Sequence, residues 1–257
     1  MLVDSHCHLD MLDLTPYGGK LGSLIKKAKS AGVEHILCVG IDLINASRVI
    51  KISEQFNNIS ASVGLHPSEK VDFELTVAEL TKLASHPKVI AIGETGLDYQ
   101  YRNKIDVEEM QNKFRLHIRA AIKLSKPLII HSRNAQEDTI QIMQEEKAKI
   151  VGGVMHCFTE SWEMAKKVID LGFYISFSGI VTFKNAKNIA EVVKRIPLEK
   201  MLIETDAPYL APEPFRGKKN EPQYVRYIAE CIANLKNAPL STVARKTTEN
   251  YYRLFNL

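Results

Sequence analysis

The chain has 257 residues, of which 45% are hydrophobic and 25% are charged, and its formal net charge at pH 7 is +4. These proportions are ordinary for a soluble globular protein that is long enough to bury a large core. The small positive charge is compatible with an anionic substrate, but it does not indicate a surface that coats nucleic acid in general.

The cysteines and the N-terminal segment bear on the compartment of the protein. The four cysteines are far apart and form no C-x-x-C pair: Cys7, Cys38, Cys157 and Cys231. This spacing predicts a reduced protein without a disulfide framework. The first ten residues, MLVDSHCHLD, contain no basic region followed by a long apolar stretch. We therefore expect no signal peptide and a cytoplasmic localisation.

Short apolar runs, each followed by an amphipathic stretch, recur along the whole chain. Eight of these runs are predicted as strands, in chain order near residues 2–8, 34–40, 59–66, 88–95, 127–133, 150–157, 173–179 and 201–208. Eight strand–helix units in about 250 residues is the pattern of a (β/α)8 TIM barrel of the α/β class. A doubly wound sheet would also alternate, but no G-x-G-x-x-G or P-loop motif is present. No linker or repeat interrupts the pattern, so we predict a single TIM-barrel hydrolase domain over residues 1–257.

Polar residues gather at the C-terminal ends of the predicted strands, which should otherwise be apolar on both faces. The residues in these positions are His6, His8, His66, Glu94, His131, His156 and Asp206. In a (β/α)8 barrel this end of the strands carries the active site. The sequence therefore predicts an active site made from these side chains.

The motif His6-Cys7-His8 closes the first predicted strand. Side chains alternate between the two faces of a strand, so the two histidines point the same way and can share one metal ion. Cys7 points the other way and is predicted to be a small buried hydrophobe, as is Cys157 beside His156. An H-x-H pair alone is weak evidence for a metal, because single histidines at strand ends are often structural.

The whole set of polar residues is harder to explain without a metal. Four imidazoles and two carboxylates on one barrel face would be costly if unpaired. Nitrogen and oxygen ligands without cysteine suit Zn, Mn, Fe, Co or Ni, with Mg less natural for imidazole. Six ligands are too many for one tetrahedral site that keeps an open position. We therefore expect two divalent ions, of Zn, Mn, Mg, Co or Ni, that share a bridging carboxylate.

Long motifs in this chain resemble those of a known family. The segments are LVDSHCHLD, VGLHPSE, AIGETGLDYQY, PLIIHSRNAQED, GVMHCF, LIETDAPYLAPEPFRGKKNEP and ARKTTENYYRLF. In this order they resemble the TatD family of metal-dependent deoxyribonucleases, within the amidohydrolase-like barrel enzymes. The departures are Lys219, where arginine is common, and the variable segment MLDLTPYGGKLG, and neither includes a proposed ligand.

The resemblance implies a role for each polar residue. His6 and His8 would bind one ion together with Asp206. His131 and His156 would bind the second ion, and Glu94 would bridge both.

Glu204 lies two residues before Asp206 and therefore on the same face of its strand, but deeper. We expect it to support the metal site from outside the ligand set, by holding a ligand histidine through the N–H of its ring. A structural ion pair inside the barrel is an equally good interpretation.

The activity that the resemblance implies is hydrolysis of a phosphodiester by a metal-activated water. Asp206, Glu94 and His66 are the candidate catalytic residues, with Asp206 as both ligand and proton acceptor. His66 would donate a hydrogen bond to a phosphate oxygen or to the leaving group. Arg133 lies two residues after His131 and would clamp a phosphate, although a salt bridge at the rim is the alternative.

The Pro-rich loop after the last strand carries Arg216, Lys218 and Lys219, which are candidates for contact with a nucleic-acid backbone. No helix-turn-helix, zinc finger or aromatic stacking motif is present. We therefore expect DNA to bind as a single strand or strand end, without sequence specificity, and we expect a 3'-5' exonuclease.

Two other functions remain open at this point. The same metal site suits another ester or an amide, such as an aminoacyl-tRNA ester or a cyclic amide. The protein would alternatively act as a binding partner in a larger assembly, but a complete ligand set argues against lost catalysis.

Overall fold

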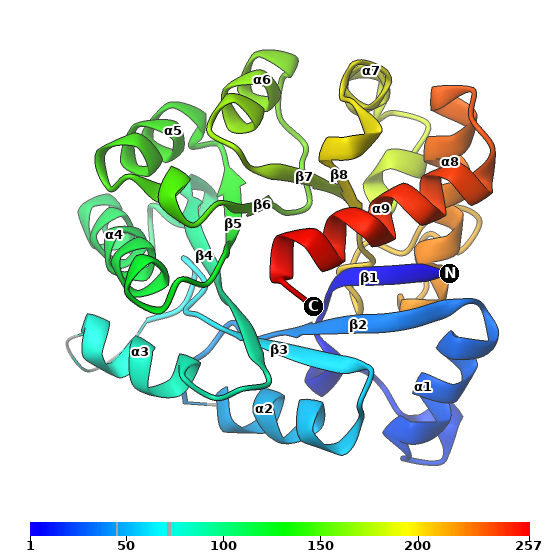
Figure 1. Ribbon diagram of the computed structural model, residues 1–257, viewed down its shortest axis with the longest axis horizontal. Coiled ribbons are helices and arrows are strands. Elements are labelled where there is room, and N and C mark those ends of the chain that lie inside the picture. Colours follow the sequence, from blue (N-terminus) through cyan, green and yellow to red (C-terminus); the bar gives the residue numbers. More distant parts are fainter. Residues whose placement is uncertain (45, 71–72, 74) are drawn as a thin grey trace. The chain divides into compact units, whose positions relative to one another are not determined.

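The computed structural model describes residues 1–44, 46–70, 73 and 75–257. Its strands pair in chain order in one eight-stranded sheet, β1 to β8, and Figure 1 labels each of them. The strands are β1 Leu2–Cys7, β2 Val33–Val39, β3 Ile59–Val63, β4 Val89–Asp98, β5 Leu128–Arg133, β6 Gly153–Met155, β7 Tyr174–Phe177 and β8 Met201–Ile203. The number and the order of the predicted strands are confirmed.

A helix follows each strand, as predicted. The α-helices are α1 Leu21–Ser30, α2 Ala46–Gln55, α3 Val77–Ala84, α4 Val107–Leu124, α5 Gln136–Glu145, α6 Trp162–Asp170, α7 Lys187–Arg195, α8 Val225–Lys236 and α9 Leu240–Phe255. The alternation of strand and helix makes this an α/β protein with the (β/α)8 barrel fold.

Contacts between Cα atoms divide the chain into two compact units. The first unit comprises residues 1–38, 157–165 and 175–257. In it, β1 pairs with β2 and β7 with β8, both in parallel, and Cys7 forms a bridge to Ala207 just after β8. The C-terminal helix α9 packs against β1 and β8 (Figure 1).

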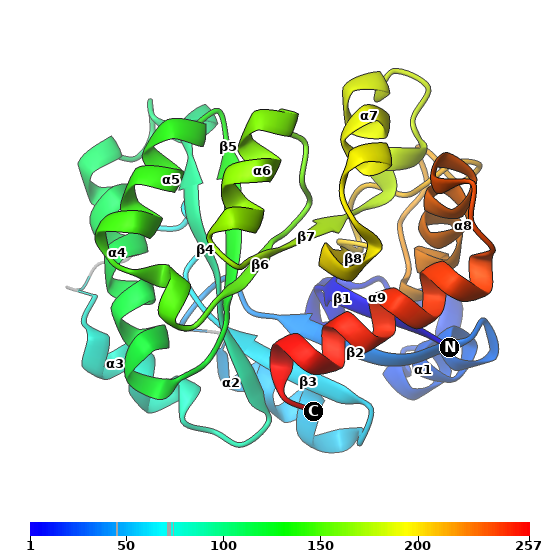
Figure 2. The same cartoon turned by 45° about the horizontal axis from the view of Figure 1, so that its top comes forward.

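The second unit comprises residues 39–156 and 166–174. Its strands β3, β4, β5 and β6 pair in parallel, each with the next. Helix α4 packs along β4 and between α3 and α5 (Figure 2). The prediction that residues 1–257 form a single domain stays a prediction.

Local sequence explains where the helices of the second unit begin. Thr76 and Glu79 form a capping box at the start of α3, in which each side chain accepts a hydrogen bond from the other residue's backbone N–H. The Asp106 side chain accepts hydrogen bonds from the N–H groups of Glu108 and Glu109 at the start of α4. These acceptors satisfy backbone donors that have no partner within the first turn of a helix.

The strands form much of the buried core. The C-terminal ends of several strands differ from the predicted ends, and this affects where the candidate site residues lie. Every residue of β1, β3 and β4 except Ile90 is buried. The sixth and eighth strands end earlier than expected, at Met155 and Ile203, and beyond these ends Cys157 and Asp206 have left-handed φ angles of 45° and 56°. The fourth strand is longer than expected, because its pairing with β5 continues as far as Asp98. Glu94 therefore lies inside β4 and not at its end.

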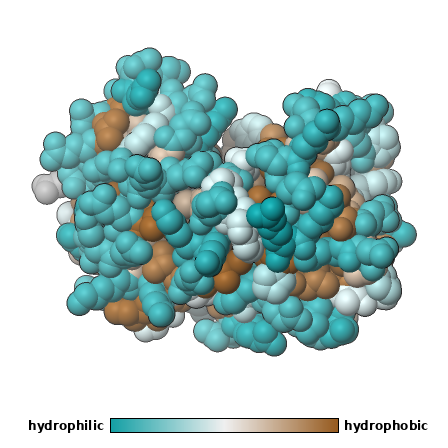
Figure 3. Space-filling model, turned by 90° about the horizontal axis from the view of Figure 1, so that it is seen from above, coloured by the Kyte–Doolittle hydropathy of each residue, from teal (hydrophilic) through white to brown (hydrophobic). Residues whose placement is uncertain are grey.

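The surface seen from above is mostly hydrophilic, with small and scattered hydrophobic patches (Figure 3). Within the described part of the chain, no helix has both the length and the apolar character needed to cross a membrane.

Candidate metal centre and active site

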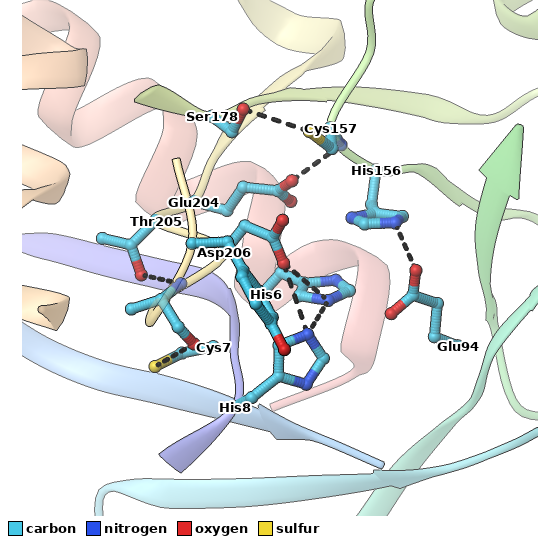
Figure 4. A network of polar contacts seen from close by, with 12 residues as sticks. His6, Cys7, His8, Glu94, His156, Cys157, Ser178, Glu204, Thr205 and Asp206 are labelled. Carbon is cyan, nitrogen blue, oxygen red and sulfur yellow. Dashed lines mark hydrogen bonds and ion pairs between the residues drawn. The ribbon is translucent and has the colours of Figure 1, made fainter. Parts of the chain in front are cut away.

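His6, His8 and Asp206, all in the first unit, form a compact group (Figure 4). The Nε2 atoms of His6 and His8 are 3.3 Å apart. Asp206 Oδ1 lies 3.5 Å from the first Nε2 atom and 3.3 Å from the second. The geometry agrees with the prediction that both rings point to one side of β1.

The three ligand atoms have the spacing that a tetrahedral ion requires. Metal–ligand bonds of about 2.1 Å at the tetrahedral angle place neighbouring ligand atoms about 3.4 Å apart. The three distances within the group are 3.3, 3.3 and 3.5 Å. Two imidazoles and one carboxylate therefore fit a divalent ion and leave its fourth position to water or substrate.

Backbone hydrogen bonds and a buried acid hold Asp206 in place. The N–H of Asp206 donates to the carbonyl of His6 over 2.9 Å. Just before it, Thr205 N–H donates to Asp4 Oδ1 over 2.8 Å, and the Thr205 hydroxyl contacts Oδ2 of Asp4 at 2.5 Å. Asp4 is fully buried, and burial raises its pKa to about 8 against the hydrogen bonds from Thr205. Asp4 was not among the predicted site residues, although it lies two residues before His6 and therefore on the same face of β1.

Cys7 does not join this group. Its side chain is fully buried, and its Sγ lies 3.8 Å from the carbonyl oxygen of Ala207. Burial, reinforced by the charges of Asp4 and Cys38, raises the pKa of this thiol well above its ordinary value. A buried thiol of this kind behaves as a small hydrophobe.

In the second unit, three imidazole rings lie close to one carboxylate oxygen, Oε1 of Glu94. Glu94 Oε1 lies 2.7 Å from Nε2 of His156 and 3.1 Å from Nδ1 of His131. Nε2 of His66 lies 3.4 Å from the same oxygen. Burial alone would raise the pKa of Glu94, but the imidazoles outweigh burial and hold this pKa well below its ordinary value.

These atoms suit a second divalent ion. Nδ1 of His131 and Nε2 of His156 are 3.3 Å apart, and both face the ionised carboxylate of Glu94. Uncharged imidazole and carboxylate are the ligands that Zn and its neighbours prefer. The role of Glu94 as a bridge, which the resemblance implies, stays a prediction.

A glycine places Glu94. A Cβ atom at Gly93 would lie 2.5 Å from the carbonyl oxygen of Ile129, and the φ angle of +144° is one that other residues rarely adopt. The pairing of β4 with β5 shifts register between Ile92 and Thr95 at this point. The glycine therefore allows the shift that turns the next side chain toward the histidines.

Asp98 lies beside a candidate metal ligand, His131, and was not predicted as a site residue from the sequence. Its Oδ2 lies 3.1 Å from Nε2 of His131, while its Oδ1 accepts a hydrogen bond from the N–H of Gln100. Burial alone would raise the pKa of Asp98, but the hydrogen bond from His131 and the charges of His131 and Arg133 keep it below its ordinary value. A hydrogen bond from Nε2–H of His131 to this carboxylate would leave the Nδ1 lone pair available to an ion beside Glu94.

His66 differs from the other two histidines near Glu94 in the hydrogen bond that its Nδ1 atom makes. Its Nδ1 accepts a hydrogen bond from the backbone N–H of Ser68 over 3.1 Å. Burial lowers the pKa of His66 to about 4, so the ring is neutral at pH 7 and carries its proton on Nε2. Nε2 is therefore a donor. His66, Glu94 and His131 together could also hold an ion, so the expectation that His66 contacts substrate and not metal stays a prediction.

Glu204 is fully buried beside β8. Its Oε1 accepts a hydrogen bond of 2.6 Å from the backbone N–H of Cys157 (Figure 4). The bond fixes the backbone one residue after His156. A direct contact with a ligand histidine stays a prediction.

The predicted substrate-binding cations are exposed; one, Arg133, lies on β5, and the other three lie in the loop after β8. Arg133 ends β5, where its backbone is the register partner of Asp98. Arg216 stacks its guanidinium 4.3 Å from the centre of the Phe183 ring. Lys218 lies beside an aromatic ring of the same loop, and Lys219 pairs with an acid, Asp13, over 2.8 Å.

Comparison with known proteins agrees with this geometry. Residues 3–256 match the family of TatD related DNases. The chain is 46% identical to a metal-dependent hydrolase of Bacillus subtilis, YabD, over all of both proteins. It is 32% identical, over 91% of its own length and 92% of the relative's, to a protein of Escherichia fergusonii named 3'-5' ssDNA/RNA exonuclease TatD.

A solved structure gives the same result for the fold. The TatD homologue YJJV of Escherichia coli superposes with a TM-score of 0.90 at 27% identity, over all of this chain and 98% of that one. The chain therefore belongs to the family of TatD related DNases and is a metal-dependent hydrolase.

Proposed function

We propose that the protein is a deoxyribonuclease that removes nucleotides from the 3' end of a single strand. The observation that carries the proposal is the triangle of His6, His8 and Asp206, whose edges match a tetrahedral divalent ion and leave one position open. The His131, His156 and Glu94 group would hold a second ion. When bound, the ions supply Lewis acidity, which lowers the pKa of water and neutralises charge on phosphoryl oxygens.

Residues of the chain supply the proton transfers. Oδ1 of Asp206 faces the two imidazoles, and we assign the uptake of a proton from the attacking water to this carboxylate. The neutral ring of His66 carries a proton on Nε2, beside Glu94. We assign to this N–H a hydrogen bond to a phosphoryl oxygen or to the leaving oxygen.

A phosphate-bearing substrate is supported by the arginine that ends β5. Arg133 is exposed, and the ionised Asp98 lies across the strand pair from it. The charge of Arg133 acts on Asp98, and an exposed guanidinium offers several donors, which suits bidentate binding of phosphate. The Escherichia fergusonii relative supports the same substrate class, because its name specifies single-stranded DNA and RNA.

The experiment that tests the proposal is a comparison of substrates with metal-reconstituted protein. We expect short single-stranded DNA to be cleaved faster than duplex DNA, and both to be cleaved faster than ester or amide substrates. Arg133→Ala should lower kcat/KM for the strand by roughly tenfold to a hundredfold, in line with the loss of a charge-assisted hydrogen bond. It should leave the metal content unchanged.

A matched control separates a substrate contact from a general loss of surface charge. Arg119 is an exposed arginine that is paired with Glu146 on the outside of the second unit. Arg119→Ala should leave cleavage unchanged. If no nucleic acid is cleaved while an ester or amide is, the nuclease assignment fails, and hydrolysis of an ester or amide on the same ligands replaces it.

A further inference from the structure

One exposed aromatic ring lies beside the metal-ligand triangle of the first unit. Tyr209 follows Asp206 by three residues, and 48% of its surface is exposed. Its ring is 6.2 Å from the His8 ring, and the two rings are nearly perpendicular at 70°. Among the described residues with large exposed hydrophobic side chains, only Tyr209 and Phe73 are aromatic.

The backbone that carries this ring is held firmly. The buried side-chain amide of Asn220 donates to the carbonyls of Thr205 and Tyr209, over 2.8 and 2.6 Å. The N–H of Asn220 donates to the carbonyl of Pro208, and the N–H of Tyr209 donates to the carbonyl of Asp206. A ring on such a backbone loses little conformational entropy when a ligand covers it.

The loop that contains Tyr209 also carries two positively charged residues a short distance along the sequence. Arg216 and Lys218 follow Tyr209 by seven and nine residues, and both are exposed. A loop that carries both an exposed aromatic ring and cations has the two kinds of group with which proteins bind single strands, because every base has a face to stack and every nucleotide has a phosphate to pair. An isolated exposed tyrosine would need no explanation, but this one touches a candidate metal ligand.

We propose that Tyr209 is a base-stacking platform for the nucleotide next to the bond that is cut. The proposal rests on the proposed nuclease function and specifies how that site recognises its substrate. Stacking is tolerant of sequence, so the platform would let the enzyme take any strand end, with a mild preference for purines because they stack more strongly. It would also make the base, and not only the phosphate, part of what the enzyme recognises.

The test uses the full-length metal-reconstituted protein and three variants, Tyr209→Ala, Tyr209→Leu and Tyr209→Phe. The substrates are a single-stranded oligonucleotide, the same strand with an abasic 3'-terminal pair of sugars, and bis(4-nitrophenyl) phosphate. We expect Tyr209→Ala to lower kcat/KM for the normal strand by roughly fivefold to a hundredfold, which is the range found when a stacking ring is removed. Tyr209→Phe should restore most of the activity, and Tyr209→Leu should not.

The abasic strand and the small diester should be cleaved equally well by the wild type and by Tyr209→Ala. A second measurement does not depend on catalysis: 2-aminopurine at the 3' end of the strand should be quenched on binding to chelator-treated wild type and to Tyr209→Phe, but not to Tyr209→Ala. Metal content should be the same in all variants.

The control is Tyr252 on α9, whose ring meets the His35 ring at 6.1 Å and 71°, almost the geometry of Tyr209 and His8. Tyr252→Ala should leave strand cleavage and quenching unchanged.

If Tyr209→Ala slows the small diester or the abasic strand as much as the normal strand, the ring only supports His8, and the platform is refuted. If the wild type cleaves and binds no strand at all, the nuclease proposal fails and the platform fails with it. A wild type that cleaves DNA with no effect of Tyr209→Ala refutes the platform alone.

Discussion

Asp98 Oδ2 lies 3.1 Å from Nε2 of His131, on the opposite side of the ring from Glu94. A neutral histidine has one ring nitrogen that donates a hydrogen bond and one whose lone pair can bind a metal ion. A hydrogen bond to Asp98 would assign the donor role to Nε2 and the metal-binding role to Nδ1. Burial alone would lower the pKa of His131, but the contacts with Asp98 and Glu94 outweigh burial and raise this pKa. With its proton on Nε2 toward Asp98, the ring would offer Nδ1 to an ion beside Glu94.

Asp98→Asn tests this relationship. The amide keeps an oxygen for the N–H of Gln100, but it presents an NH2 group to His131, which would move the ring proton to Nδ1 and block the lone pair that faces Glu94. We expect metal affinity to fall by roughly tenfold to a hundredfold, measured by competition with a chromophoric chelator. Asp106→Asn is the control, because asparagine caps α4 as well as aspartate does. Unchanged affinity in Asp98→Asn would mean that the carboxylate does not orient the ring.

Stability should depend on pH through His117, a buried histidine far from any proposed ligand in sequence. Its Nε2 accepts a hydrogen bond from the N–H of Leu65, and its Nδ1 lies 2.7 Å from the carbonyl of Lys113. Burial lowers its pKa from 6.5 to about 4. Between pH 6.5 and pH 4, this histidine is protonated in the unfolded chain but not in the folded protein. The free energy of unfolding should therefore be highest above pH 6.5 and should decrease as the pH falls toward 4.

The measurement is urea unfolding of metal-free protein at several pH values. The wild type should lose up to roughly 3 kcal/mol more than His117→Gln between pH 7 and pH 4, because a tenfold difference in proton affinity between the folded and unfolded chain corresponds to about 1.4 kcal/mol. Parallel pH profiles for the two proteins would show that His117 is not the titrating group.

The loop after β8 should control the salt dependence of strand binding. Each lysine that contacts a phosphate of a single strand adds about 0.7 to the slope of log K against log salt concentration. Lys219 is paired with Asp13, whose pKa this contact lowers, whereas Lys218 lies beside an aromatic ring. We expect Lys218→Ala to flatten the slope by about 0.7 and Lys219→Ala to flatten it less, by fluorescence anisotropy of a labelled oligonucleotide. Wild-type slopes in both variants would exclude the loop from the backbone contact.

Cys7 should affect stability but not metal binding. Its buried thiol faces the carbonyl of Ala207, and replacement by serine buries a more polar group in the same space. Cys7→Ser should lower the free energy of unfolding by roughly 1–3 kcal/mol and leave the metal content unchanged. The partly buried Cys231 provides the control substitution. Loss of metal from a folded Cys7→Ser protein would contradict the direction in which β1 presents its side chains.

The fold and most of the candidate metal ligands could be predicted from the sequence, because the alternation of side chains along a strand and the presence of polar residues in apolar runs are local signals. His6 and His8 converge because residues two apart share a strand face, and the fold itself follows from the repeated strand–helix pattern. Asp98 could not be found in this way, because the strand was expected to end near Glu94, and only the pairing with β5 extends it. The role of Asp4 was hidden for a similar reason, since its partner Thr205 lies 201 residues away.

The central claim is that the carboxylate and imidazole groups hold ions that cleave a nucleic-acid strand. It is tested most directly by the shortening of a 5'-labelled single-stranded oligonucleotide, with the wild type and Glu94→Gln measured in Mn, in Zn and in excess chelator. Glu94→Gln removes the charge that faces three imidazoles. Its control, Glu54→Gln, removes an exposed carboxylate that lies 3.2 Å from the half-buried His86. We predict stepwise loss of nucleotides from the 3' end by the wild type and Glu54→Gln, none in chelator, and at least about a hundredfold slower loss with Glu94→Gln. Undiminished shortening in chelator or with Glu94→Gln would contradict the account.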